Sequence, residues 1–161
     1  MEQKLFHSSL GVQFTVRDVV QEIIRFLRED ETRKYKIIIG SDSQGINDSK
    51  DIDFVTAIVV HRVGNGGRYF WRRLHERGFY TFRDRILQEV MFSIDVAKEL
   101  LAVLHELEIR HFDFEIHVDI GEQGATKVML QEVLGMIRAY NFEARTKPES
   151  YAATKVADRH V

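Results

Sequence analysis

Three consecutive isoleucines, Ile37 to Ile39, lead directly into a short polar run at residues 40–43 (GSDS). A continuous β-branched run is typical of a central strand that is covered on both faces. Such a strand needs other strands beside it and helices above and below it. The run therefore predicts an α/β protein in which polar residues follow closely on a buried strand.

The rest of the chain supplies the neighbours of this strand. Hydrophobic periodicity predicts a first helix over residues 15–30, capped by Thr15, and a main core helix over residues 82–108. The pattern predicts a mixed five-stranded sheet with helices on both faces, in which the first strand is central and the third is an edge. The remaining expected elements are strands at 54–61, 69–76, 112–119 and 142–147, a helix at 126–140, and a last helix that begins near Ser150.

Composition limits the class of protein. The 161 residues suit one domain, residues 1–161, with residues 1–32 as an N-terminal helical extension. Cysteine is absent, which excludes disulfides and thiolate zinc sites and fits a reducing compartment. The net charge of −2 gives no global positive field, so a nucleic-acid site must be local. No signal peptide or membrane-spanning run is evident, and we expect a cytoplasmic protein without a membrane partner.

Four acidic residues fall on elements that should converge on one edge of the sheet. Asp42 closely follows the buried run, where an unpaired carboxylate is costly. Glu89 lies among apolar neighbours on its helix, and Asp119 ends the strand expected next to the first one. Asp158 lies on the last helix. Each also has an ordinary interpretation, which is a turn or cap for Asp42, a helix-dipole interaction for Glu89, a turn for Asp119 and a solvated chain end for Asp158.

The strand that carries Asp119 leaves two further alternatives open. Asp113, Glu115, His117 and Asp119 alternate with apolar residues, so their face could simply be solvated. His117 and Asp119 could also form a two-ligand metal pair.

Clustered carboxylates repel one another, and the usual reason to hold several together is one or two divalent cations. Carboxylate oxygens suit Mg²⁺ or Mn²⁺. Two such ions would bracket a scissile phosphate and activate a water. If the four acids meet, they predict a phosphodiesterase site.

An arginine-rich strand is a second candidate site. Seven arginines between residues 61 and 85, with aromatic residues among them, make a local positive field suited to phosphates and bases. Arg68 and Arg72 share one face of the strand and Arg73 lies on the other. Lys147 flanks the acidic residues and could hold a phosphate. The alternative is an ordinary edge strand protected from aggregation by its charge.

Four segments resemble the bacterial YkuK family, which is ribonuclease H-like: residues 37–44 (IIIGSDSQ), 117–122 (HVDIGE), 147–153 (KPESYAA) and 157–160 (ADRH). The resemblance implies a sheet of order 3-2-1-4-5 and an acidic site for two ions. It implies Asp42, Glu89, Asp119 and Asp158 as catalytic metal ligands, with His160 as an alternative to Asp158.

These observations predict a divalent-metal-dependent nuclease that hydrolyses phosphodiester bonds in RNA, RNA–DNA hybrid or branched DNA. The alternative is a ribonuclease H-like module that binds nucleic acid or protein without turnover, because a fold does not determine a function. Nucleotide hydrolysis is disfavoured because the chain has no Walker-type string. Neither the substrate nor the oligomeric state follows from the sequence.

Overall fold

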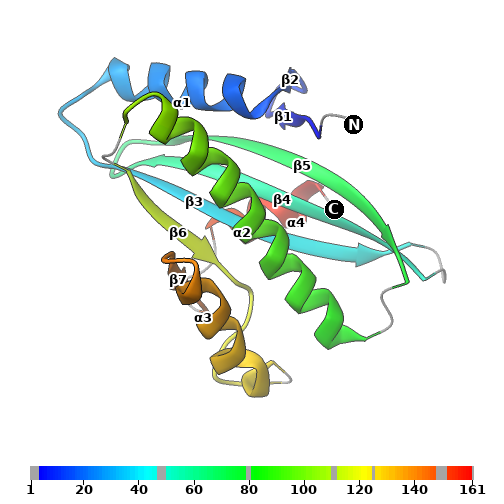
Figure 1. The fold of residues 1–161 in the computed structure, drawn as a ribbon. Helices are drawn as coiled ribbons and strands as arrows, with labels where there is room; N and C mark the ends of the chain where they lie inside the picture. The colour runs from blue at the N-terminus through cyan, green and yellow to red at the C-terminus, as the bar shows by residue number, and fades with distance from the viewer. Residues whose placement is uncertain are drawn as a thin grey trace.

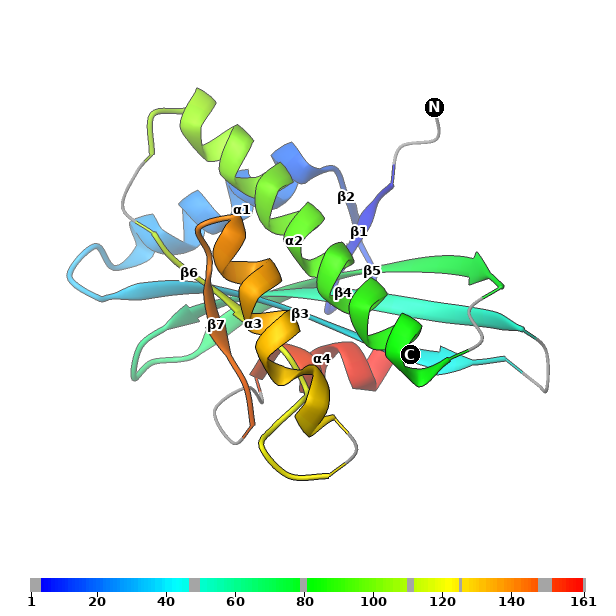
Figure 2. The same cartoon turned by 60° about the horizontal axis from the view of Figure 1, so that its bottom comes forward.

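The structure is a computed structural model that describes residues 4–46, 50–78, 81–109, 112–124, 126–147 and 152–160. The described strands form one sheet, with helices α1, α2 and α3 on one face and α4 on the other (Figures 1 and 2). The elements are β1 (Phe6–Ser8), β2 (Gln13–Phe14), α1 (Val16–Glu29), β3 (Tyr35–Gly45), β4 (Asp51–Arg62), β5 (Gly67–Arg77), α2 (Phe82–Glu106), β6 (Asp113–His117), the 3₁₀ helix η1 (Lys127–Met129), α3 (Leu130–Ala139), β7 (Glu143–Arg145) and α4 (Ala152–His160).

The sheet has seven strands in the order β2-β1-β5-β4-β3-β6-β7. Strands β3, β4 and β5 are antiparallel neighbours, whereas β6 runs parallel to β3 and β7 parallel to β6. The five strands expected from the sequence lie side by side as β5-β4-β3-β6-β7, with β3 in the middle. The expected total of five strands is wrong, because two further strands precede α1.

The two further strands, β1 and β2, form a hairpin where we expected only a polar lead. Ser8 Oγ accepts hydrogen bonds from the backbone N–H groups of Leu10 and Val12, both at 3.2 Å, and Gly11 has a φ of 80° that suits the turn. The hairpin pairs with β5 through His7↔Trp71, so β5 is not an open edge along that length. Strands of three and two residues are too short for alternation to reveal them in a sequence.

The central strand β3 is buried on both faces, as its isoleucines predict. Ile37 and Ile39 are fully buried in the main core, and Ile38, on the face covered by α4, is 5% exposed. The strand also continues through the polar run to Gly45. The residues expected to follow the buried strand are therefore part of it.

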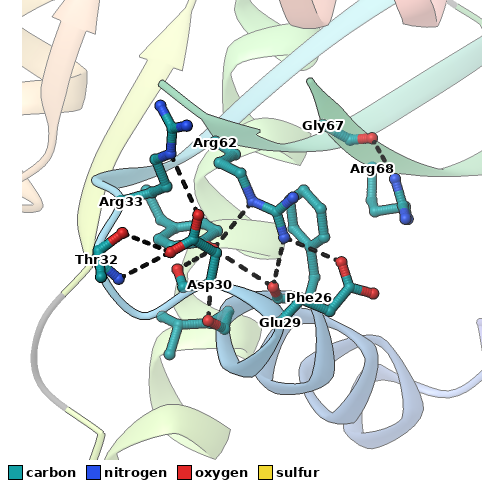
Figure 3. A network of polar contacts seen from close by, with 10 residues as sticks. Phe26, Glu29, Asp30, Thr32, Arg33, Arg62, Gly67 and Arg68 are labelled. Atoms are coloured by element: carbon teal, nitrogen blue, oxygen red, sulfur yellow. Dashed lines mark hydrogen bonds and ion pairs between the residues drawn. The ribbon is translucent and has the colours of Figure 1, made fainter. Parts of the chain in front are cut away.

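Helix α1 is fixed to the sheet at its C-terminal end by Arg62 of β4. The guanidinium donates to the Phe26 carbonyl at 2.9 Å, the Glu29 carboxylate at 3.0 Å and the Tyr35 hydroxyl at 3.0 Å (Figure 3). It also lies 4.0 Å from the centroid of the Phe26 ring. Thr15 caps the start of the helix, as expected. These contacts hold α1 against the sheet.

Helix α4 lies on the opposite face and contacts β3, β4 and β5. Ala157 is fully buried against Val55 and Ala57 of β4. Ser150, the expected cap of this last helix, lies outside the described residues. Among the helices that the structure describes, none combines the length and apolar composition needed to cross a membrane.

Candidate carboxylate site

Side chains alternate along the polar run of β3, residues 40–43, so successive side chains lie on opposite faces of the sheet. Ser41 Oγ lies 2.7 Å from Ser93 Oγ of α2, and Ser43 Oγ donates to Glu89 Oε1 of α2 at 2.8 Å. Asp42 points to the other face, towards α4. Its carboxylate accepts a hydrogen bond from the Ser43 N–H at 2.9 Å. Because Asp42 lies inside an 11-residue strand, it is neither a turn residue nor a helix cap.

Asp42 is a half-buried carboxylate surrounded by other acids. Burial raises the pKa of Asp42 to about 6, and only the hydrogen bond from the Ser43 N–H opposes this shift. Asp158, which lies within hydrogen-bonding reach, and the charge of Asp119 contribute to the same rise. The ionised form of Asp42 is therefore less favourable than that of an ordinary aspartate, and a nearby cation would stabilise it.

Glu89 is the most deeply buried of the four predicted acids, with 9% of the residue exposed. Burial raises the pKa of Glu89 to about 8, and the negative charges of Asp42 and Asp119 add to the shift. The Ser43 hydrogen bond and the Arg85 charge lower the pKa, but by less. The exposed helix-dipole role considered for Glu89 is therefore wrong, because the side chain faces β3 and the other acids.

Asp119 lies just beyond β6 and is 56% exposed at its side chain. Its Oδ1 atom is 3.2 Å from Nζ of Lys147, whose side chain is 59% exposed. Gly121 permits this approach of the two segments, because a Cβ atom at Gly121 would lie only 3.2 Å from the Lys147 Cβ. Asp119 is thus paired with a cation of the chain itself while it repels the charges of Asp42 and Glu89.

Asp158, rather than His160, lies beside Asp42. The His160 ring instead stacks on Trp71 of β5, with centroids 4.4 Å apart and an interplanar angle of 10°. Its Nε2 atom is buried without a hydrogen-bond partner. Burial, the nearby arginines and His7 lower the pKa of His160, which favours the neutral ring. The two alternatives for the fourth ligand therefore lie in different surroundings.

Asp42 thus interacts with Asp158 and Asp119, and Glu89 interacts with Asp42 and Asp119. In the ranges that the structure describes, however, no three acidic or histidine side chains are close enough to hold a metal ion as they stand. The donor atoms are carboxylate oxygens, which fit a hard cation such as Mg²⁺ or Mn²⁺. A cation would fit this site chemically, and it would have to draw the carboxylates closer together.

The basic residues expected to bind substrate do not form one surface. Arg72 is 4% exposed, donates to Glu99 at 3.1 Å and is buried on the α2 face of the sheet. Arg68 lies on the same face near α1, 4.6 Å from the centroid of the Phe26 ring (Figure 3). The structure does not bring either arginine to the carboxylates.

The other two basic residues lie on or near the α4 side. Arg73 donates to the backbone carbonyl of His160, at the end of α4, and sits over the Trp71 ring. Lys147 is the one predicted basic residue that contacts a predicted acid, through its ion pair with Asp119. The expected arginine surface is therefore divided between two faces of the sheet.

The β6 face that we considered solvated is exposed at Asp113 and Asp119 but buried between them. Glu115 and His117 are each 5% exposed, and His117 Nε2 lies 3.0 Å from Glu115 Oε2. Glu115 Oε1 also lies 3.2 Å from Lys36 Nζ and 3.6 Å from Arg145 Nη2. We call Lys36, Glu115, His117 and Arg145 the β6 charge cluster. Its histidine pairs with Glu115 rather than with Asp119, contrary to the metal-pair alternative.

Sequence reasoning missed two residues that contact the site. Ser43 donates to Glu89, and Arg85 donates to Ser43 through both Nε (3.2 Å to Oγ) and Nη2 (2.8 Å to the carbonyl). One signal was available, because Arg85 precedes Glu89 by four residues and so lies on the same side of a helix.

The comparisons with known proteins agree with this architecture. The model of the ribonuclease H-like family matches residues 18–161. The "Uncharacterized protein YkuK" of Bacillus subtilis (strain 168) is 32% identical over 170 aligned residues, which cover 96% of this chain and 95% of that protein. No solved structure matches the chain significantly. The chain therefore belongs to the YkuK family of ribonuclease H-like proteins.

Proposed function

We propose that the protein is a divalent-metal-dependent nuclease whose metal ligands are Asp42, Glu89, Asp119 and Asp158. One observation carries this proposal. Two half-buried or buried carboxylates, Asp42 and Glu89, have raised pKa values and have further acids as neighbours, and the nearby Arg85 does not offset the rise at Glu89. Perturbed carboxylates of this kind are more frequent at functional sites than elsewhere. Membership in a ribonuclease H-like family supports a role that involves nucleic acid.

The chain's own residues would prepare the site for a cation. Glu89 would release its proton as positive charge arrives, and ionised Asp42 would be stabilised, because a nearby opposite charge favours the ionised form. Asp119 would give up its ion pair with Lys147 and bind the cation instead. The exposed ammonium group of Lys147 would then be available to a phosphate oxygen. A bound Mg²⁺ or Mn²⁺ would polarise a phosphodiester and make water a better nucleophile.

The test is a calorimetric titration with Mn²⁺ of the wild type and of Asp42→Asn. We expect the wild type to bind Mn²⁺ and Asp42→Asn to lose binding. Asp95→Asn is the matched control, because it makes the same change at an exposed position of α2. A cleavage screen of RNA, RNA–DNA hybrid, single-stranded DNA and junctions then identifies the substrate. Unchanged cleavage by purified Asp42→Asn would refute the proposed site.

A binding module without turnover is the second candidate. It is favoured by the spacing of the acids, since no three of them in the described parts of the chain lie within reach of one ion. This candidate predicts nucleic-acid binding that does not change when Mn²⁺ is removed with a chelator. A nuclease instead predicts that cleavage stops under the same treatment.

A further inference from the structure

Three polar side chains connect α2 to β3 in series: Arg85, Ser43 and Glu89. Arg85 Nε donates to Ser43 Oγ at 3.2 Å, and Arg85 Nη2 donates to the Ser43 carbonyl at 2.8 Å. Ser43 Oγ lies 2.8 Å from Glu89 Oε1. The arginine therefore holds both the side chain and the backbone of the serine that contacts the glutamate.

The direction of these hydrogen bonds follows from the atoms involved. A guanidinium can only donate, whereas a serine hydroxyl has one proton to donate and lone pairs that accept. Since Arg85 occupies Ser43 Oγ as an acceptor, the hydroxyl proton is directed to Glu89. Arg85 thus makes Ser43 a donor to Glu89 Oε1.

This arrangement leaves one oxygen of Glu89 for a ligand. Oε1 is engaged by Ser43, and Oε2 has no hydrogen-bond partner among the described residues. The residue is 9% exposed, and Oε2 is not one of the fully buried unpartnered atoms, so it remains accessible to a ligand. A carboxylate with one oxygen fixed and the other free is oriented before a ligand arrives.

Arg85 differs from the other arginines near the ends of these elements. Arg83, two residues earlier, forms an ion pair with Glu132 at 2.6 Å, and Arg72 forms one with Glu99 at 3.1 Å. Arg85 forms no ion pair among the described residues, and its hydrogen bonds go to Ser43. Arg85 therefore hydrogen-bonds to the serine and reaches the Glu89 carboxylate through it.

We propose that Arg85 is a positioning residue that acts through Ser43 to orient Glu89 towards the cation of the carboxylate site. The proposal rests on the proposed function for the identity of the ligand. The hydrogen-bond series itself is independent of any ligand. The positioning role of Arg85 and the proposed metal-dependent function can therefore be refuted separately.

The sign of the change in Mn²⁺ affinity separates positioning from simple electrostatics. Removing a positive charge near a cation site should strengthen cation binding if charge alone matters. Losing a positioning group should weaken it, typically by about 10-fold to 100-fold. We expect Arg85→Met to weaken Mn²⁺ binding by about 10-fold or more, as judged from outer-shell partners in other metal sites.

The matched control is Arg83→Met, which removes a positive charge from the same helix but not from Ser43. It should bind Mn²⁺ as the wild type does or slightly more tightly. Ser43→Ala should weaken binding as Arg85→Met does, and the double variant should be no worse than either single one. Ser43→Thr keeps the hydroxyl and should restore binding. Wild-type or tighter affinity in folded Arg85→Met would overturn the proposal and leave the proposed function intact.

A second measurement needs no metal. Urea unfolding of Arg85→Met, Glu89→Gln and their combination measures the coupling between the two residues. We expect a non-additive change in the unfolding midpoint with Ser43 present and an additive one in the Ser43→Ala background. If the wild type binds no Mn²⁺, the proposed function fails and this cycle alone decides whether Arg85 orients Glu89. Additive changes in both backgrounds would overturn the inference.

Discussion

The carboxylate site and the β6 charge cluster both place acidic side chains in the interior, but their surroundings have opposite signs. Glu115 in the cluster has Lys36 and His117 within hydrogen-bonding distance. Asp42 and Glu89 in the site have further carboxylates as neighbours. The difference separates a buried acid that its neighbours stabilise in the charged form from buried acids that their surroundings destabilise in that form.

The pKa values express this difference directly. Burial alone would raise the pKa of Glu115, but the hydrogen bonds and charges of His117 and Lys36 bring it below its ordinary value. Burial raises the pKa of Glu89 to about 8, and the hydrogen bond from Ser43 does not reverse the shift. A buried acid with a cationic partner is a structural group, whereas one without such a partner needs a proton or a ligand.

The largest expected effect is on the pH dependence of stability. The folded protein favours protonated Glu89, with a pKa of about 8 against an ordinary value of 4.5. This contribution is fully present below pH 4.5 and is lost as the pH rises through about 8. Between pH 5 and 8.5, the wild type should lose on the order of 3 kcal/mol of unfolding free energy relative to Glu89→Gln.

Urea denaturation at several pH values measures this difference. Glu122→Gln is the control, because Glu122 is exposed and the same substitution there should leave the pH dependence unchanged. If the unfolding free energies of the wild type and Glu89→Gln change with pH in parallel, Glu89 does not have a raised pKa in the folded protein.

The second prediction contrasts the two glutamates at pH 7. Glu115→Gln removes the negative charge that Lys36, His117 and Arg145 surround, and it should lower the unfolding free energy by about 2 kcal/mol. Glu89→Gln should be close to neutral, because Glu89 with a pKa of about 8 is already largely uncharged at pH 7 and glutamine is a neutral side chain of similar shape. Chemical denaturation of both variants provides the measurement. The reverse order of stabilities would contradict the distinction between the two clusters.

The smallest effect concerns Lys147, which partly neutralises the carboxylate site. Lys147→Met frees Asp119 and should strengthen Mn²⁺ binding by about threefold, because exposed ion pairs contribute little. Lys127→Met is the control, since Lys127 is exposed and has no described ion pair. Calorimetry measures the affinity, and weaker Mn²⁺ binding by Lys147→Met would show that the lysine supports the cation instead of competing with it. A parallel loss of nucleic-acid affinity would support contact with a phosphate.

Long elements with a strong pattern were predictable from the sequence. The isoleucines of β3 indicated a strand buried on both faces, and Thr15 indicated the start of α1. The hairpin of β1 and β2 was not predictable, because its strands are short and depend on pairing with β5. The burial of Glu115 was also missed. An acidic residue on an alternating strand resembles a solvated residue in the sequence, and its partners Lys36 of β3 and Arg145 of β7 become evident only in the structure.

The candidate site was likewise predictable only in part. Asp42, Glu89, Asp119 and Asp158 were identified from local context and from the family resemblance. Their mutual repulsion, the contact of Asp119 with Lys147 and the separation of Asp158 from His160 required the structure. The arginine-rich strand shows most clearly what the sequence pattern could not predict. Alternation indicated that its side chains divide between two faces, but it did not indicate that Arg72 is buried beneath α2.

The sequence by itself determined the central strand, the order of helices and strands that follow it, and the acidic residues that we propose as ligands. These features depend on hydrophobic periodicity and residue chemistry, which are local properties of the chain. Only the tertiary structure decided which charges are compensated, because a pKa depends on groups that lie far apart in sequence and on the burial they share. Glu89 and Glu115 have the same side chain, and the contacts of the folded protein alone set their pKa values in opposite directions.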